Sequence, residues 1–352
     1  MARKFKYLWV FLIPIIAFIS FYSQGIGSFM LFIFAFELIP LLELFIQPDS
    51  KNISKIEEEI LKEDKYYDYL VYMIVPIHYG LLFLYLYRLQ SDLTWTEIIG
   101  YTICMGVLNG VFGINVAHEL GHRVKPHERI MAKLLLLSTL YMHFYIEHNR
   151  GHHKNVSTPN DPASSRRNET VYTFWFRSII FSYLSAWKLE YQRLKNKNLP
   201  FWSLQNEMLR FQIFQILWVL TIYFFTNFMV TIGFVVAAVM GWLLLETVNY
   251  IEHYGLARKE IQPKIYERVM PHHSWNSNHV LGRIFLFELS RHSDHHYKAS
   301  RKYQILNHHE NAPQMPTGYP GMMLLALIPP LWFYVMNKQI DNYFHQHPNF
   351  IS

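Results

Sequence analysis

Cysteine is almost absent from this chain, which has one, Cys104, among 352 residues. A single cysteine excludes a disulfide framework and every zinc or iron–sulfur site that is built from several cysteines. The sequence also has no flavin motif and no G-x-G-x-x-G pattern of the kind that binds dinucleotides. A redox activity of this chain would therefore need a metal held by other side chains.

Charge is the second shortage. Asp, Glu, Lys and Arg make up 16% of the residues, against about 25% in soluble domains. Hydrophobic residues make up 51%, which is typical of a membrane protein. The formal net charge of +6 is modest, and in so apolar a chain the basic residues are better explained as topology signals than as a nucleic-acid footprint.

Apolar runs of about 20 residues are long enough to cross a bilayer as helices. The basic, apolar start has no small-residue cleavage site, so we expect it to be retained as a first span. Two shorter apolar stretches lie at 131–146 and 321–336, and the second contains Pro329-Pro330, which breaks a regular helix. We expect six spans, at about 7–22, 28–47, 69–88, 97–117, 209–229 and 231–251.

The Lys and Arg residues indicate the topology. Nearly all of them lie in the first six residues, the 48–66 loop, the 119–208 stretch and the tail after 252. The positive-inside rule places these regions, and so both termini, in the cytoplasm. The 119–208 stretch also carries aromatic residues throughout, which favours interfacial helices over a disordered linker. The expectation is one all-α integral membrane domain, 1–352, with six transmembrane helices, interfacial helices and a cytoplasmic histidine-rich site.

Histidine is concentrated in four motifs: HELGH (118–122), EHNRGHH (147–153), NYIEHYG (249–255) and RHSDHH (291–296). Spacings of i, i+3 and i+4 place side chains on one face of a helix. Neutral imidazole is a good ligand for iron, zinc, copper and nickel. Six spans, with 131–146 not crossing, bring all four motifs to the cytoplasmic side. Nine histidines are too many for one metal and suit two. They are His118, His122, His148, His152, His153, His253, His292, His295 and His296.

The remaining histidines are weaker candidates. His272, His273 and His279 are expected beside the ligands. His78, in the middle of a span, is better explained as a satisfied core residue, although an ionisable group there is often functional. Residues of the tail are expected to be solvated, namely His308, His309, His345 and His347.

HELGH also fits H-E-x-x-H, in which two histidines bind zinc and the glutamate acts as a base. A membrane zinc protease is therefore an alternative, but it would leave about six clustered histidines without a role. Carboxylates flank the histidines without the E-x-x-H repeat of di-iron carboxylate bundles. They are Glu119, Glu147, Glu252 and Asp294.

Taken in order, the four motifs resemble those of the membrane-bound non-haem di-iron alkane 1-monooxygenases. HSWNSN (273–278) and PTGYPGM (316–322) are similar as well, and the resemblance runs from about 70 to 337. NYIEHYG is its most specific element, since membrane fatty acyl desaturases and carotene or sterol oxygenases share an eight-histidine pattern. Ser290 departs from the family, which usually has Gln before the arginine of RHSDHH.

The resemblance implies that the same nine histidines bind two iron ions. It implies O₂-dependent hydroxylation of the terminal methyl group of an n-alkane to a primary alcohol, in the bacterial inner membrane. The alkane would arrive through the lipid, and a separate rubredoxin, reduced by a rubredoxin reductase, would supply electrons. A desaturase is the alternative within this chemistry. An acidic donor is expected to dock on basic residues near the motifs, namely Arg123, Lys125, Arg129, Arg150, Lys154, Arg166 and Arg167.

Overall fold

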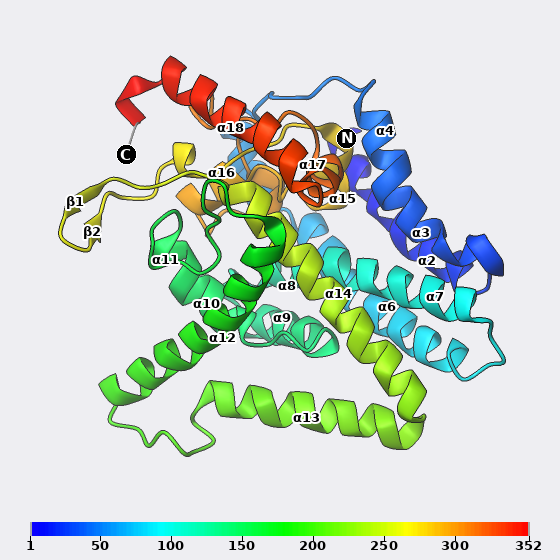
Figure 1. Ribbon diagram of the computed structural model, residues 1–352. Helices are drawn as coiled ribbons and strands as arrows, with labels where there is room; N and C mark the ends of the chain where they lie inside the picture. Colours follow the sequence, from blue (N-terminus) through cyan, green and yellow to red (C-terminus); the bar gives the residue numbers. More distant parts are fainter. Residues whose placement is uncertain (1, 351–352) are drawn as a thin grey trace. The chain divides into compact units, whose positions relative to one another are not determined.

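The computed structural model describes residues 2–350 and is mainly helical (Figure 1). The chain divides into two compact units. Unit 1 contains the described residues up to Glu37, together with Asp64–Asn149 and Tyr183–Leu245. Unit 2 contains Leu38–Glu63, Arg150–Ser182 and the described residues from Glu246 onward.

Unit 1 holds most of the long apolar helices. Polar caps begin them: Asp64 accepts a hydrogen bond from the backbone of Tyr66, and Thr94 and Glu97 form a capping box. The helices are α1 (Ala2–Phe5), α2 (Leu12–Ser20), α3 (Met30–Ile33), α6 (Lys65–Arg88), α7 (Trp95–Leu108), α8 (Asn115–Gly121), α9 (Pro126–Ser138), α10 (Phe144–Glu147) and α13 (Glu207–Phe225). Helix α2 packs on α6 and α7, and α9 packs on α6 and α8.

Two long helices, α12 (Val171–Asn196) and α14 (Phe228–His253), have residues in both units. Unit 2 otherwise consists of short elements. These are α4 (Ile39–Glu43), α5 (Lys55–Glu63), α11 (His153–Asn155), the antiparallel strands β1 (Glu260–Gln262) and β2 (Ile265–Tyr266), α15 (Val280–Phe285), α16 (His292–Tyr297), α17 (Tyr319–Ala326) and α18 (Pro329–Gln346). Helix α4 packs on α15 and α17, and α17 packs on α18.

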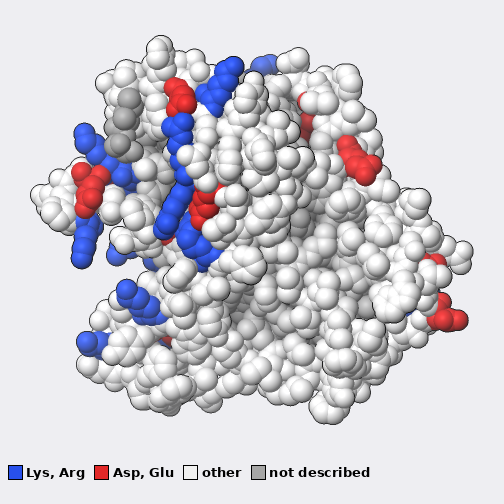
Figure 2. All heavy atoms as spheres, in the orientation of Figure 1, with Lys and Arg blue, Asp and Glu red and all other residues white. Residues whose placement is uncertain are grey.

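Within the described chain, five helices are long and apolar enough to cross a membrane. They are Gly25–Glu43, Lys65–Arg88, Trp95–Gly121, Glu207–Phe225 and Phe228–His253. The surface over α13 shows almost only uncharged side chains (Figure 2). Five of the six expected spans are thus present as long helices. The first, expected at 7–22, is the shorter apolar helix Lys6–Ser20.

Neither of the two short apolar stretches forms a single long apolar helix. In 131–146 the helix α9 ends at Ser138 and has 13 residues. It is about 20 Å long, which is less than the roughly 30 Å of a bilayer core. In 321–336 the chain breaks between α17 and α18, and Pro329 and Pro330 form the first turn of α18. Proline fits there because the first turn has no intrahelical partner for its missing N–H.

Candidate metal centre

Four histidines of unit 2 turn toward one another in its interior. They are His152, His253, His292 and His296. All four are buried, and one ring nitrogen of each lies within 4.8 Å of one on every other. They come from the π-helical turn His148–His152, from the last residue of α14 and from α16. EHNRGHH, NYIEHYG and RHSDHH therefore supply one common cluster, called here the four-His set.

Helix α16 presents His292 and His296 on one face, as their i, i+4 spacing predicts. Its first turn is anchored by Arg291, whose guanidinium donates to backbone carbonyls of two neighbouring loops at 2.7 and 2.9 Å. Asp294, on the same short helix, is paired with Arg301 at 2.8 Å. These contacts hold a six-residue helix in the orientation that directs both imidazoles inward.

The glycine of NYIEHYG ends α14 directly after its ligand candidate. Gly255 has a φ of +69°, in the left-handed region that glycine adopts without a steric cost. A side chain at this position would also collide with Ile340. The turn sends the chain away from His253, and the Gly255 N–H bonds the carbonyl of Ser165 at 3.2 Å.

The ring nitrogens of the four-His set suit a single cation. Nε2 of His152 lies 3.2 Å from Nε2 of His296, and Nε2 of His253 lies 3.3 Å from Nε2 of His292. Nitrogens bound at about 2.1 Å to one ion lie roughly 3 Å apart. Burial and the charges of neighbouring histidines hold the pKa of His296 well below its usual value. Its imidazole is therefore neutral and has a lone pair for a metal.

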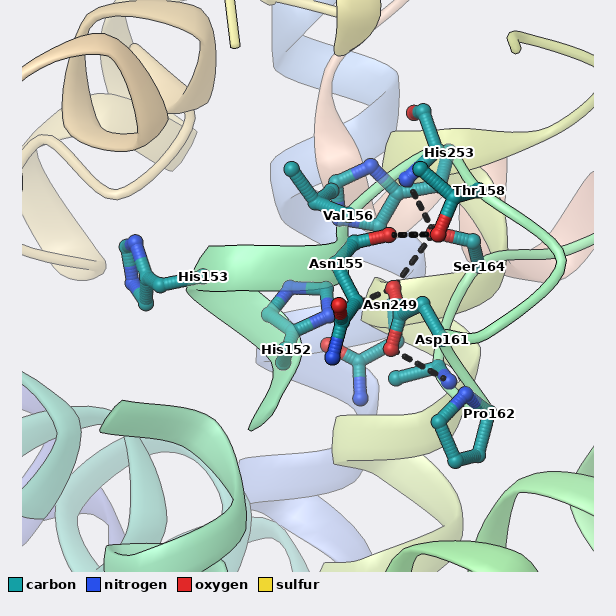
Figure 3. Close-up of polar contacts among 12 residues, drawn as sticks. His152, His153, Asn155, Val156, Thr158, Asp161, Pro162, Ser164, Asn249 and His253 are labelled. Carbon is teal, nitrogen blue, oxygen red and sulfur yellow. Dashed lines mark hydrogen bonds and ion pairs between the residues drawn. The ribbon is translucent and has the colours of Figure 1, made fainter. Parts of the chain in front are cut away.

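Asp161 fixes the orientation of one of these rings. Its Oδ2 lies 2.9 Å from Nδ1 of His152 and accepts the hydroxyl of Ser164 at 2.5 Å (Figure 3). Burial alone would raise the pKa of Asp161, but His152 and Ser164 lower it, so the carboxyl stays ionised. The Nδ1 proton of His152 then faces Asp161 and its Nε2 lone pair faces the set, the arrangement found in carboxylate–histidine–metal sites.

Glu252 contacts a different member of the set, His292. Its Oε2 is 3.1 Å from Nε2 of His292, and its Oε1 accepts the hydroxyl of Tyr319 at 2.7 Å. Both side chains are buried. A carboxylate oxygen thus borders the nitrogens of the four-His set.

His153 is the neighbour of His152 in sequence, but its ring points in a different direction (Figure 3). Its Nε2 lies 3.1 Å from Nε2 of His295. The two pairs are adjacent, since the rings of His153 and His296 stack with centroids 4.5 Å apart. His153 and His295 therefore form a second pair of converging nitrogens within unit 2.

Unit 1 holds the other three candidates. Nε2 of His122 and of His148 are 3.1 Å apart, and the ring of His118 lies 4.4 Å from that of His148. The carboxylate of Glu119 is ion-paired with Arg123. This ion pair gives Glu119 a structural partner and so argues against the zinc-protease alternative.

A third cluster, Glu267 with His272 and His273, has ligand atoms within 4.8 Å of one another. It is less suited to a metal. Nδ1 of His273 accepts the Met270 N–H at 3.0 Å, and its Nε2 faces Glu267 at 3.2 Å. Since both nitrogens are used in hydrogen bonds, His273 has no lone pair left. Its role is to hold the loop.

Several expectations about single residues need correction or completion. Arg123 is buried and bonded to Asp68 and Glu119, so it cannot bind a docking partner. His309, expected in solvent, bonds Asp294 at 2.7 Å. His78 is a buried core residue, as expected, and its Nε2 lies 2.9 Å from the hydroxyl oxygen of Ser138.

Two further polar residues have different surroundings. Glu37 interrupts the apolar stretch 28–47 and is exposed on its helix, whereas His78 is buried and contacts Ser138. Ser290, where the family usually has Gln, is buried, and its hydroxyl has no hydrogen-bond partner among the described residues.

Asp161 was missed altogether. It lies in the TPNDPASS loop, where no periodic spacing connects it to a histidine. The one available signal is its position shortly after EHNRGHH, between prolines and small polar residues that favour a tight turn.

The chain matches known proteins over most of its length. The fatty acid desaturase family matches residues 93–326, which contain all nine histidines. This match and the five long apolar helices define an integral membrane protein of that histidine-rich class.

Full-length relatives make the assignment more specific. The alkane 1-monooxygenase of Pseudomonas putida is 38% identical over 349 residues, covering 97% of this chain and 86% of the relative. Alkane 1-monooxygenase 1 of Alcanivorax borkumensis is 39% identical over 316 residues, covering 90% and 78%. The xylene/toluene monooxygenase hydroxylase component XylM of Pseudomonas putida is 28% identical over 271 residues, covering 76% and 72%. The chain belongs to the alkane 1-monooxygenase family.

Proposed function

We propose that this chain, acting as one domain, hydroxylates the terminal methyl group of n-alkanes to a primary alcohol. The observation that carries the proposal is the similarity to alkane 1-monooxygenases over 97% of the chain, combined with buried imidazoles whose Nε2 atoms converge. An unactivated methyl group offers nothing for acid, base or nucleophilic catalysis by side chains. A redox metal must supply the reactivity, while the protein supplies position and excludes water.

Two iron ions are the proposed cofactor. Imidazole sets without thiolate suit iron, which when bound activates O₂ for insertion into a C–H bond. The residues of this chain bind and orient it: Asp161 holds His152, and Arg291 and Asp294 hold α16. The proposed ligands are His118, His122, His148, His152, His153, His253, His292, His295 and His296.

The electron donor is proposed to be a rubredoxin, reduced by a rubredoxin reductase. Hydroxylation converts an alkane, O₂, two electrons and two protons into an alcohol and water. Cys104 is buried and is the single cysteine of this sequence, which supports an electron donor outside these 352 residues. Basic side chains exposed in one or other unit are available to an acidic donor. They are Lys125, Arg129, Lys154, Arg166 and Arg167.

The proposed topology has six spans and both termini in the cytoplasm of a bacterium, with the chain in the inner membrane. The short helix Lys6–Ser20 would be the first span. Helix α9, with 13 residues, is too short to add a seventh. The charge asymmetry of the connections supports a cytoplasmic position for all four histidine motifs. Reporter tags on the 48–66 loop and at both termini should all report cytoplasm.

The decisive experiment combines product and metal analysis. Purified protein should contain about two irons per chain and little zinc. With rubredoxin, its reductase and NADH, it should convert n-alkanes to 1-alkanols. An alkene product would identify a desaturase instead. Stoichiometric zinc with protease activity that is lost on changing Glu119 would refute the oxygenase.

A further inference from the structure

The PTGYPGM motif has a Tyr whose position is tightly constrained. Tyr319 is the first residue of α17, Gly318 is its N-cap and Pro320 occupies the first turn. A Cβ at Gly318 would clash with the carboxylate of Glu43 unless that side chain moved, so glycine allows the two segments to approach closely. The ring of Tyr319 is fully buried. Its hydroxyl therefore has a fixed direction.

The hydrogen-bond partner of that hydroxyl is Glu252. Tyr319 donates to Oε1 at 2.7 Å, while Oε2 lies 3.1 Å from Nε2 of His292. The backbone of Glu252 is fixed as well, because its carbonyl accepts the Trp275 N–H at 2.8 Å. A buried carboxylate needs partners for its lone pairs. Without the hydroxyl, Oε1 would be unpaired and the group would be free to rotate about its last torsion.

The direction of Oε2 matters because Nε2 of His292 is a nitrogen of the four-His set, 3.3 Å from Nε2 of His253. A metal held there leaves this nitrogen without a proton. With a metal bound, Nε2 of His292 would not donate to Oε2, and the negative charge of Oε2 would then act on the cation. The electrostatic field at a bound ion would therefore depend on the orientation of the Glu252 carboxylate and on how strongly that orientation is restrained.

We propose that Tyr319 is a positioning residue for the oxygenase: through its hydroxyl it keeps Oε2 of Glu252 directed at the four-His set. The inference rests on the proposed function, because it assigns a role toward the iron proposed for that set. This role depends on the hydroxyl of Tyr319 and not on its packing, because a phenylalanine would fill almost the same volume.

The test is Tyr319→Phe in the full-length protein loaded with ⁵⁷Fe. Iron content should stay near that of the unmodified protein, because the histidine ligands are unchanged. The Mössbauer quadrupole splitting of one iron site should shift. The turnover number should fall by about 10–100-fold, as for groups that orient ligands, with the KM for alkane unchanged and less alcohol formed per O₂ consumed.

Tyr343→Phe is the matched control. Tyr343 is also largely buried and donates one hydroxyl hydrogen bond of 2.7 Å, to the carbonyl of Asn311 in the same unit. Its loss should change neither the Mössbauer spectrum nor the turnover. A double variant, Tyr319→Phe with Glu252→Gln, should be no slower than Glu252→Gln alone, because the tyrosine acts through the glutamate.

Three results would overturn the inference: an unshifted Mössbauer spectrum in Tyr319→Phe, losses equal to those of Tyr343→Phe, or losses that add to those of Glu252→Gln. The spectrum is recorded without substrate. It therefore tests the role of Tyr319 independently of turnover. Absence of alcohol from the unmodified protein would instead contradict the proposed function.

Discussion

Replacing Asp161 with Asn should weaken iron binding at the four-His set without changing the fold. Oδ1 of Asp161 accepts the Ala163 N–H at 3.1 Å, and Oδ2 accepts from Nδ1 of His152 at 2.9 Å and from Ser164 at 2.5 Å. All the neighbours are donors. Asparagine replaces one of the two acceptor oxygens with a donor, so one of these contacts must be lost.

Both orientations of the new amide are unfavourable. If its NH₂ faces His152, the ring must carry its proton on Nε2, and it is then no longer a ligand. If its NH₂ faces the N–H of Ala163, a buried donor loses its acceptor, which costs about 1–3 kcal/mol. Each tenfold change in an equilibrium constant is about 1.4 kcal/mol. We therefore expect iron affinity at this set to fall about 10–100-fold, the range typical of groups that orient metal ligands.

The assay is iron retention against a graded series of chelator concentrations, with metal per chain measured by mass spectrometry. Asp341→Asn is the control, because Asp341 is exposed and pairs with Arg167 at the surface. Ser164→Ala removes one donor to Asp161 and the acceptor of the Ser157 N–H, but it leaves both oxygens of Asp161 in place and should give a smaller shift. Retention curves for Asp161→Asn that overlay those of the unmodified protein would refute the reasoning, as would an equal shift in the Asp341 control.

Three other outcomes are expected. Arg123→Ala should lower the free energy of unfolding by about 3–5 kcal/mol, because it leaves two buried carboxylates without their cation; a thermal shift no larger than for an exposed arginine would contradict this. His253→Ala should remove at least one iron and all activity, whereas His272→Ala should keep iron with at most a 10–100-fold loss; equal iron loss in both would mean that the ligand set is wrong. Reversing the charge of Arg166 and Arg167 should raise the KM for rubredoxin and leave iron content intact, and turnover should slow as salt rises; salt-independent kinetics would remove the docking surface but not the need for a donor.

The helices and the histidine motifs were predictable because both follow short periodic rules. Apolar runs gave five long helices close to their expected bounds, and the spacing within RHSDHH placed His292 and His296 on one face of α16. What the sequence could not give is contact between distant segments. Asp161 and Tyr319 contact partners that lie across a turn or far away in the chain, and no local pattern predicts these contacts.

The same limit explains the error at Arg123. In a sequence, an arginine after a ligand motif looks the same whether it faces solvent or a carboxylate. Its partner Asp68 lies on α6, 55 residues earlier, and only the packing of α6 against α8 and α9 brings them together. His309 was misjudged for a similar reason, because Asp294 reaches it from another segment.

The divergence of His152 and His153 has a consequence for how the protein acquires metal. One peptide bond joins a member of the four-His set to a member of the His153–His295 pair, and the π-helical turn His148–His152 ends at that bond. An ion captured by His152 would fix the backbone torsions that also aim His153. If metal binds at both places, as proposed above, we expect an ion at one position to help orient the ligand at the other. A helix break introduced within this turn would change the orientation of both His152 and His153. A backbone substitution here is therefore expected to affect both positions and not one alone.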